Sequence, residues 1–139
     1  MTPGARVAAQ IDILEAILSG VPAEKALTNW ARGNRFAGSK DRAALRDLVF
    51  QAQRCRRSAG AWPAPQSARA WAIGTLRANG EDPNEFFTGI AHAPAALCAD
   101  DVTPLPSDRD RLDLQDWVID LLTQQYGAEQ TAKIGAVLR

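Results

Sequence analysis

Residues 39–58 read SKDRAALRDLVFQAQRCRRS, and this stretch decides the class of fold. Its apolar residues recur at spacings of three and four, which places them on one side of a helix: Leu45, Leu48, Val49 and Ala52. Ser39 is predicted to be the N-cap, and the Asp41 carboxylate in the first turn suits the helix dipole. We therefore predict a helix from about Lys40 to Ser58 with one buried face.

The residues before this stretch predict two more helices. Pro3 begins an apolar repeat at helical spacing that ends at Gly20. Pro22 begins a second helix, which is expected to place Trp30 on its inner face and to stop at a left-handed Gly33-Asn34 pair.

The residues after it predict the same class of structure. Ser67 is expected to cap a helix that buries Trp71 and ends at Asn79-Gly80, and a short helical turn follows over residues 82–89. Three prolines predict a loop from 92 to 106. Asp113 is expected to cap a helix that ends at Tyr126-Gly127. This helix is expected to bury Leu114, Trp117, Val118 and Leu121. A last helix is expected to begin at Ala128. No stretch alternates with the period of a strand, so we predict an all-α fold.

Composition favours one cytoplasmic domain. The chain has 139 residues, 46% of them hydrophobic and 23% charged, which is typical of a single globular unit. No apolar run reaches the roughly 20 residues of a membrane helix. Cys55 and Cys98 are far apart and are each expected to be buried and unpaired, and His92 is the one histidine, so no metal site is expected.

Charge is divided unequally along the chain. Residues 1–77 carry twelve basic and five acidic side chains, a charge of +7, whereas residues 78–139 carry four basic and eleven acidic ones, a charge of −7. Between Trp30 and Arg57 the local charge is +6. Clustered guanidinium groups attract polyanions whatever the net charge of the whole protein, so the basic half predicts a nucleic-acid partner.

The candidate RNA-contact residues lie on and just before the 40–58 helix. Arginine binds phosphate oxygens through a planar fork, which suits a surface that follows a nucleic-acid backbone. The candidates are Arg32, Arg35, Lys40, Arg42, Arg46, Arg54 and Arg57. The alternative is that these side chains are solvated or are neutralised by the acidic second half. Phe50 is expected to be core, and Trp62, next to prolines, is the tryptophan expected to be exposed.

No catalytic arrangement is predicted. The chain has no glycine-rich nucleotide or S-adenosylmethionine loop. His92 and Cys98 are separated by six residues of Pro/Ala loop, which gives no reason to expect contact between them. The aspartates between 100 and 120 are expected to solvate the surface rather than to bind magnesium.

One run of sequence resembles a known family. The segment 35–50, RFAGSKDRAALRDLVF, followed by Arg54, resembles the third-helix signature of NusB-like domains. The segments 22–32 and 82–89 look more specifically like the N-terminal domain of RsmB/Sun (Fmu) type bacterial rRNA cytosine-C5 methyltransferases. The likeness covers essentially the whole chain.

The resemblance implies a NusB-like bundle of about six to eight helices. It implies that residues 1–139 are a single RNA-binding domain that presents ribosomal RNA to a methyltransferase domain of the same polypeptide, expected beyond residue 139. That domain would bind S-adenosylmethionine and form 5-methylcytosine. The last helix is still periodic at Arg139, which also leads us to expect a longer protein. Cys55 and Cys98 stand in Arg-Cys-Arg and Leu-Cys-Ala, outside the family's catalytic contexts, so no residue of this chain is expected to be catalytic.

Two other functions stay open at this stage. The helices could dock a protein partner or the methyltransferase domain itself, with the acidic half as the docking surface. A free-standing regulator of transcription, similar to the antitermination factor NusB, would require the natural C-terminus to lie near Arg139.

Overall fold

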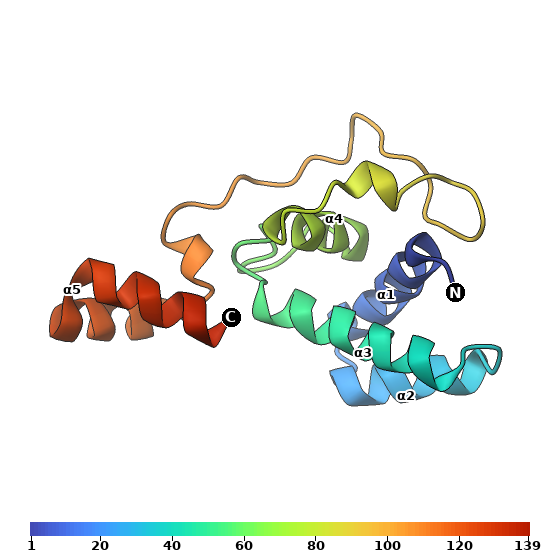
Figure 1. Ribbon diagram of the computed structural model, residues 1–139, viewed down its shortest axis with the longest axis horizontal. Helices are drawn as coiled ribbons and strands as arrows, with labels where there is room; N and C mark the ends of the chain where they lie inside the picture. The colour runs from blue at the N-terminus through green and yellow to red at the C-terminus, as the bar shows by residue number, and fades with distance from the viewer.

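The computed structural model describes residues 1–139 and contains five α-helices and no strand (Figure 1). The helices are α1 (Pro3–Leu18), α2 (Ala23–Gly33), α3 (Ser39–Arg54), α4 (Ala68–Ala78) and α5 (Asp116–Leu138). Two 3-10 turns, η1 (Pro83–Glu85) and η2 (Asp110–Leu112), lie between α4 and α5. The all-α prediction is confirmed. The number of helices is lower than expected, because residues 82–89 contain only one short 3-10 turn and the two predicted C-terminal helices are counted together as α5. The predicted break between those two helices is found at Gly127.

Helices α1 to α4 form the body of the protein, and α1 lies against the other three. Their inner faces meet in a core around Trp71, whose side chain is fully buried and whose indole N–H donates to the Ala52 carbonyl at 3.0 Å. The other buried members of this core are small or aliphatic, apart from Phe87: Val7, Leu14, Ala52, Ala59, Ala61, Ala68, Ala72, Ile73 and Leu76. Ile13, Ala26 and Val49 form a second buried cluster where α1, α2 and α3 meet.

Several predicted helix ends agree with the structure. Thr2 caps α1, and its hydroxyl accepts from the Ala5 backbone N–H. Ser67 caps α4 by accepting from the Ala70 backbone N–H, as expected. The predicted stop of α2 is at the right place but has the wrong conformation, since Asn34 has φ −122° and its side chain donates to the Trp30 carbonyl instead.

The predicted bounds of the arginine-rich helix need two corrections. Its N-cap is Gly38, so Ser39 is already the first helical residue. It ends at Arg54 rather than Ser58, because the Ser58 backbone N–H and hydroxyl both donate to the Asp113 carboxylate, at 2.8 and 2.6 Å. The turn that follows rests directly on α4, where a side chain at Gly74 would overlap the Ala59 carbonyl.

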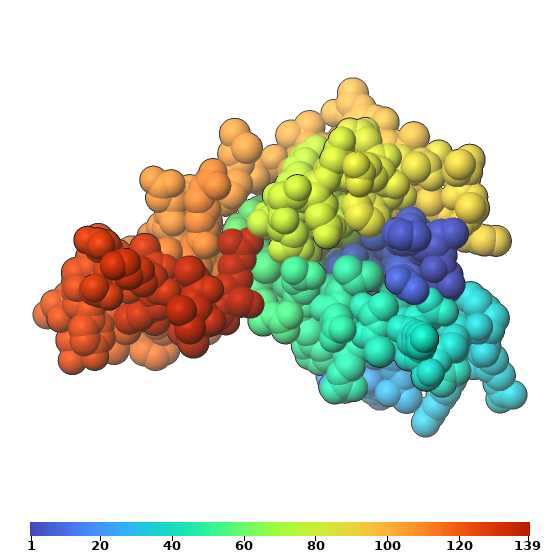
Figure 2. Space-filling view, in the orientation of Figure 1, coloured from blue at the N-terminus to red at the C-terminus, as the bar shows by residue number.

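The C-terminal segment projects from one end of the body (Figures 1 and 2). Gly127 interrupts α5 with φ 82° and ψ 165°, so that its two arms lie side by side. The Thr123 hydroxyl bridges the arms by donating to the Thr131 hydroxyl at 3.4 Å.

The predicted start and buried face of this segment are wrong. Asp113 does not cap the helix, because its carboxylate is bound to Ser58 and the helix begins at Asp116 with Gln115 as N-cap. Trp117 is 65% exposed and Leu121 is 52% exposed, whereas Ile119 is buried. The other two residues of the predicted stripe, Leu114 and Val118, are partly buried, so only part of that stripe is covered. No helix of the chain has the length and apolar character needed to cross a lipid bilayer.

Candidate nucleic-acid interface

Six of the seven candidate RNA-contact residues are exposed. Arg32 lies at the end of α2, Arg35 in the α2–α3 loop, and the others along α3. The six exposed cations are Arg32, Arg35, Lys40, Arg42, Arg46 and Arg54, and we call them the α2–α3 basic surface. A helix of 16 residues is about 24 Å long, so the α3 members extend along a length comparable to several phosphates of a nucleic-acid strand.

The packing of α2 against α3 leaves a shallow groove beneath these side chains. One part, of about 520 Å³, is lined by Arg32, Arg35 and Arg42. The adjoining part, of about 360 Å³, is lined by Arg42 and Arg46 together with Trp30. Arg42 therefore lies at the centre of the groove, with guanidinium groups from three separate segments around it.

Few carboxylates neutralise this surface. Arg46 pairs with Glu24 at 2.6 Å, but both side chains are more than half exposed, and such pairs contribute about 0–1 kcal/mol. Arg42 donates from Nε to the Ala37 carbonyl at 3.0 Å, which holds its fork in place without cancelling its charge. Arg32, Arg35, Lys40 and Arg54 form no ion pair. Most of the positive charge is therefore available to an anionic partner.

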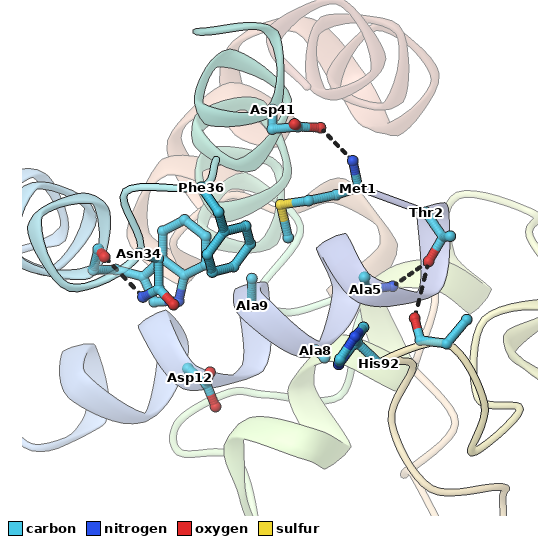
Figure 3. Close-up of a pocket in the computed structure, with 12 residues that line it drawn as sticks. Met1, Thr2, Ala5, Ala8, Ala9, Asp12, Asn34, Phe36, Asp41 and His92 are labelled. Atoms are coloured by element: carbon cyan, nitrogen blue, oxygen red, sulfur yellow. Dashed lines mark hydrogen bonds and ion pairs between the residues drawn. The ribbon is translucent and has the colours of Figure 1, made fainter. Parts of the chain in front are cut away.

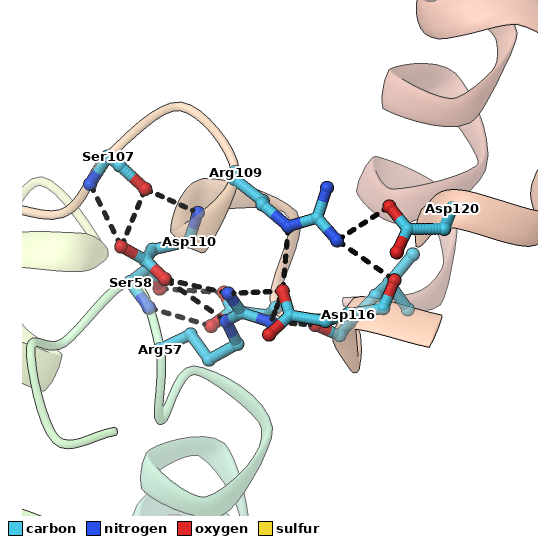
Figure 4. A network of polar contacts seen from close by, with 9 residues as sticks. Arg57, Ser58, Ser107, Arg109, Asp110, Asp116 and Asp120 are labelled. Carbon is cyan, nitrogen blue, oxygen red and sulfur yellow. Dashed lines mark hydrogen bonds and ion pairs between the residues drawn. The ribbon is translucent and has the colours of Figure 1, made fainter. Parts of the chain in front are cut away.

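Arg57 must be removed from the candidate set, because it is buried by the acidic half of the chain (Figure 4). Its side chain is 9% exposed, and its guanidinium donates to Asp110 at 2.9 Å and to Asp116 at 3.0 Å. It also donates to the Leu114 carbonyl at 2.7 Å. The alternative of neutralisation by the acidic half therefore holds for Arg57, although its acceptors lie more than 50 residues away and could not be named from the sequence.

The electrostatics of this buried cluster agree with a structural role. Burial lowers the pKa of Arg57, but hydrogen bonds to Asp110 and Asp116 outweigh it and raise the pKa above its ordinary value. The pKa of Asp116 is lowered by Arg109 and then by Arg57, and that of Asp110 by Ser107 and then by Arg57. All of these groups keep their charges near neutral pH, so Arg57 joins the projecting segment to the body.

The predictions for the remaining aromatic residues and cysteines have mixed outcomes. Trp71 is buried and Trp62 is 48% exposed, both as predicted. Phe50 is partly buried, and the Arg46 guanidinium lies 5.6 Å above its ring. Both cysteines are unpaired, but only Cys55 is buried, because Cys98 lies in the proline-containing loop on the surface. Asp101 in that loop is bound by Arg69 at 2.7 Å, which strongly lowers the pKa of the carboxyl group.

Sequence reasoning missed a second concave site beside the basic surface (Figure 3). It has a volume of about 810 Å³ and lies between α1, the α2–α3 loop and the loop that contains His92. Trp30 and Phe36 meet edge to face in its wall, with ring centroids 6.4 Å apart. The one sequence signal for this site was Phe36, an aromatic residue that follows Arg35 in a loop. An aromatic side chain in a loop is expected to be exposed and can therefore mark a binding site. We call this site the Phe36 pocket.

No group of three or more His, Cys, Asp or Glu side chains in the chain is arranged to hold a metal ion. No protein-family model, no curated protein and no solved structure matches this chain. The candidate site therefore has to be interpreted from its own geometry and charge.

Proposed function

We propose that this chain is a NusB-like RNA-binding domain that presents ribosomal RNA to a cytosine-C5 methyltransferase domain elsewhere in the same polypeptide. The observation that carries the proposal is the α2–α3 basic surface, where four of the six exposed cations line a groove and one of the six has a carboxylate partner. The sequence resemblance of segment 35–50 to NusB-like domains supports the same conclusion.

Within this proposal the domain contributes binding and the chemistry belongs to the other domain. The helical chain contains no strand followed by a glycine-rich turn and a helix, so its residues do not fit an S-adenosylmethionine site. The one histidine, His92, lines the Phe36 pocket, which neither cysteine lines. We accordingly assign the cofactor to the catalytic domain and place the protein in the bacterial cytoplasm, where its RNA is found.

The test is the salt dependence of RNA binding. Each phosphate contact contributes to the slope of log K against log salt concentration, by about −0.7 for single strands and −0.9 for duplexes. Replacing Arg32, Arg35 and Arg42 with glutamine should make the slope shallower by about two and weaken binding to small-subunit rRNA fragments. Arg111→Gln is the control, because Arg111 is exposed but lies in the acidic half. Equal slopes for the triple variant and the wild type would exclude the α2–α3 basic surface as the RNA site.

A docking function is the second candidate, and a different observation favours it. The projecting segment exposes large apolar side chains on both arms of α5: Trp117, Leu121, Tyr126, Val137 and Leu138. Apolar interfaces are screened little by salt, whereas phosphate contacts are weakened strongly. Partner binding that persists at high salt and is lost on Trp117→Ser would support docking through α5.

A further inference from the structure

We infer that the Phe36 pocket receives an unpaired guanine from an RNA strand whose phosphates lie on the α2–α3 basic surface. This inference rests on the proposed function and names the feature of the RNA that the domain would recognise. It draws on three observations: the position of the pocket, its aromatic wall and its carboxylates.

The pocket and the basic surface share the α2–α3 loop. Phe36 lines the pocket, whereas its neighbour Arg35 lines the arginine groove. Trp30 lines both the pocket and the adjoining part of the groove. A strand whose backbone contacts Arg35 therefore passes close enough to turn a base into the pocket.

The aromatic wall provides a stacking platform. Phe36 is 74% exposed, although an aromatic side chain of this size would normally be covered, and Trp30 supports it edge to face. Proteins bind unpaired bases by stacking them on such rings, with about 1–3 kcal/mol per base. The volume of about 810 Å³ also falls within the range of about 300–1,000 Å³ that is typical of small-ligand sites.

The charges in the pocket favour a base over a phosphate. Asp41 is already paired with Arg6 at 2.9 Å and with the Met1 ammonium group at 3.3 Å. Asp12 is exposed and has no ion-pair partner. Partial desolvation, followed by the nearby Glu15 charge, raises its pKa, although a hydrogen bond from the Trp30 side chain acts in the opposite direction. A carboxylate that no cation neutralises repels phosphate, and its two oxygens can accept from further N–H donors besides Trp30.

Guanine matches this carboxylate best among the four bases. Its Watson–Crick edge presents the N1–H and N2–H donors side by side, which can engage both oxygens of one carboxylate. Cytosine and adenine each offer one amino group, and uracil offers a single N–H between two carbonyl oxygens. The expected order of preference is guanine first and uracil last.

The experiment compares RNA duplexes that differ in one bulged nucleotide. Wild-type protein should bind a guanosine bulge about tenfold more tightly than an abasic bulge, given the energy of stacking. Phe36→Ala should make the two affinities equal without changing the salt slope, and Asp12→Asn should reduce the preference for guanosine over uridine. Leu105→Ala, at a side chain that is 93% exposed far along the chain, is the matched control and should change neither ratio.

The outcomes separate this inference from the proposed function. Salt-dependent binding with no difference between guanosine and abasic bulges, or an unchanged ratio in Phe36→Ala, overturns the pocket inference and leaves the basic surface intact. Absence of salt-dependent RNA binding overturns the proposed function. Guanosine alone, titrated against the full chain while the Trp30 indole N–H signal is followed, tests the pocket directly, and a signal that does not move in the wild type also overturns the inference.

Discussion

The α1–α4 body and the α5 segment are built from similar apolar patterns but use them differently. In the body, Trp71 is fully buried among three helices, whereas Trp117 in α5 is 65% exposed. The two regions also differ in how their arginines are paired. Most arginines of the α2–α3 basic surface have no ion-pair partner, whereas Arg109 in the acidic half is bound by Asp116 and Asp120. The body therefore supports itself by packing, and the C-terminal segment is held by ion pairs.

Replacing the two tryptophans gives the largest contrast. Trp71→Ala should lower the free energy of unfolding by about 3–5 kcal/mol, because it opens a cavity and leaves the Ala52 carbonyl without its donor. Trp117→Ala should change it by less than about 0.5 kcal/mol. Urea denaturation followed by circular dichroism measures both. Comparable losses for the two variants would mean that α5 is packed as tightly as the body.

Removing the buried guanidinium should loosen α5 selectively. Arg57→Gln leaves Asp110 Oδ1 and the Leu114 carbonyl without their donor, at a cost of about 1.5–3 kcal/mol for hydrogen bonds to charged groups. Amide hydrogen exchange should accelerate over residues 116–138 while the protection of α1 and α4 stays as in the wild type. Equal acceleration in α4 would contradict the division into a self-supporting body and a segment held by ions.

Acid should weaken the same attachment. The pKa values of Asp110 and Asp116 are lowered in the folded protein, so both groups stabilise it above the ordinary aspartate pKa of about 4. This stabilisation is lost as the pH falls through their lower folded values. When the pH is lowered from 6 to 2, the amide chemical shifts of α5 should change before those of α3. In the Arg57→Gln variant, the α5 shifts should depend less on pH.

The exposed ion pair of the body should have the smallest effect. Glu24→Gln should change the free energy of unfolding by less than about 1 kcal/mol, since both partners are solvated. It should nevertheless raise RNA affinity by releasing Arg46, and a filter-binding assay at low salt measures this. Unchanged affinity would indicate that Arg46 takes no part in the contact.

Local sequence signals predicted most of the body. Pro3, Pro22 and Ser67 act on their own helices through backbone geometry and capping, so the starts of α1, α2 and α4 could be inferred without knowing the tertiary structure. The inward position of Trp71 followed from helical periodicity. The periodicity of α3 also placed Arg42, Arg46 and Arg54 away from its buried face, and all three are exposed.

The errors arose where a distant partner decides the outcome. Arg57 looks like Arg54 in the sequence, and only Asp110 and Asp116 make it structural. Asp113 resembles an N-cap, but Ser58 takes its carboxylate and the residue adopts a left-handed conformation with φ 52°. Trp117 has correct helical spacing, but periodicity cannot say whether another helix covers it. The Phe36 pocket was missed because three separate segments form it.

The reversal at Gly127 determines where the far end of α5 lies. As an uninterrupted helix, its 23 residues would form a rod about 34 Å long pointing away from the rest of the protein. The reversal instead brings Arg139 back to the base, where it donates to the Ala78 carbonyl at 2.9 Å and pairs with Asp113 at 3.4 Å. Both ends of the hairpin are thus anchored beside the α3–α4 turn. One glycine therefore turns a straight projecting helix into a hairpin whose two ends are both attached to the body. Gly127→Ala would disfavour the positive φ at this position and would favour the straight helix.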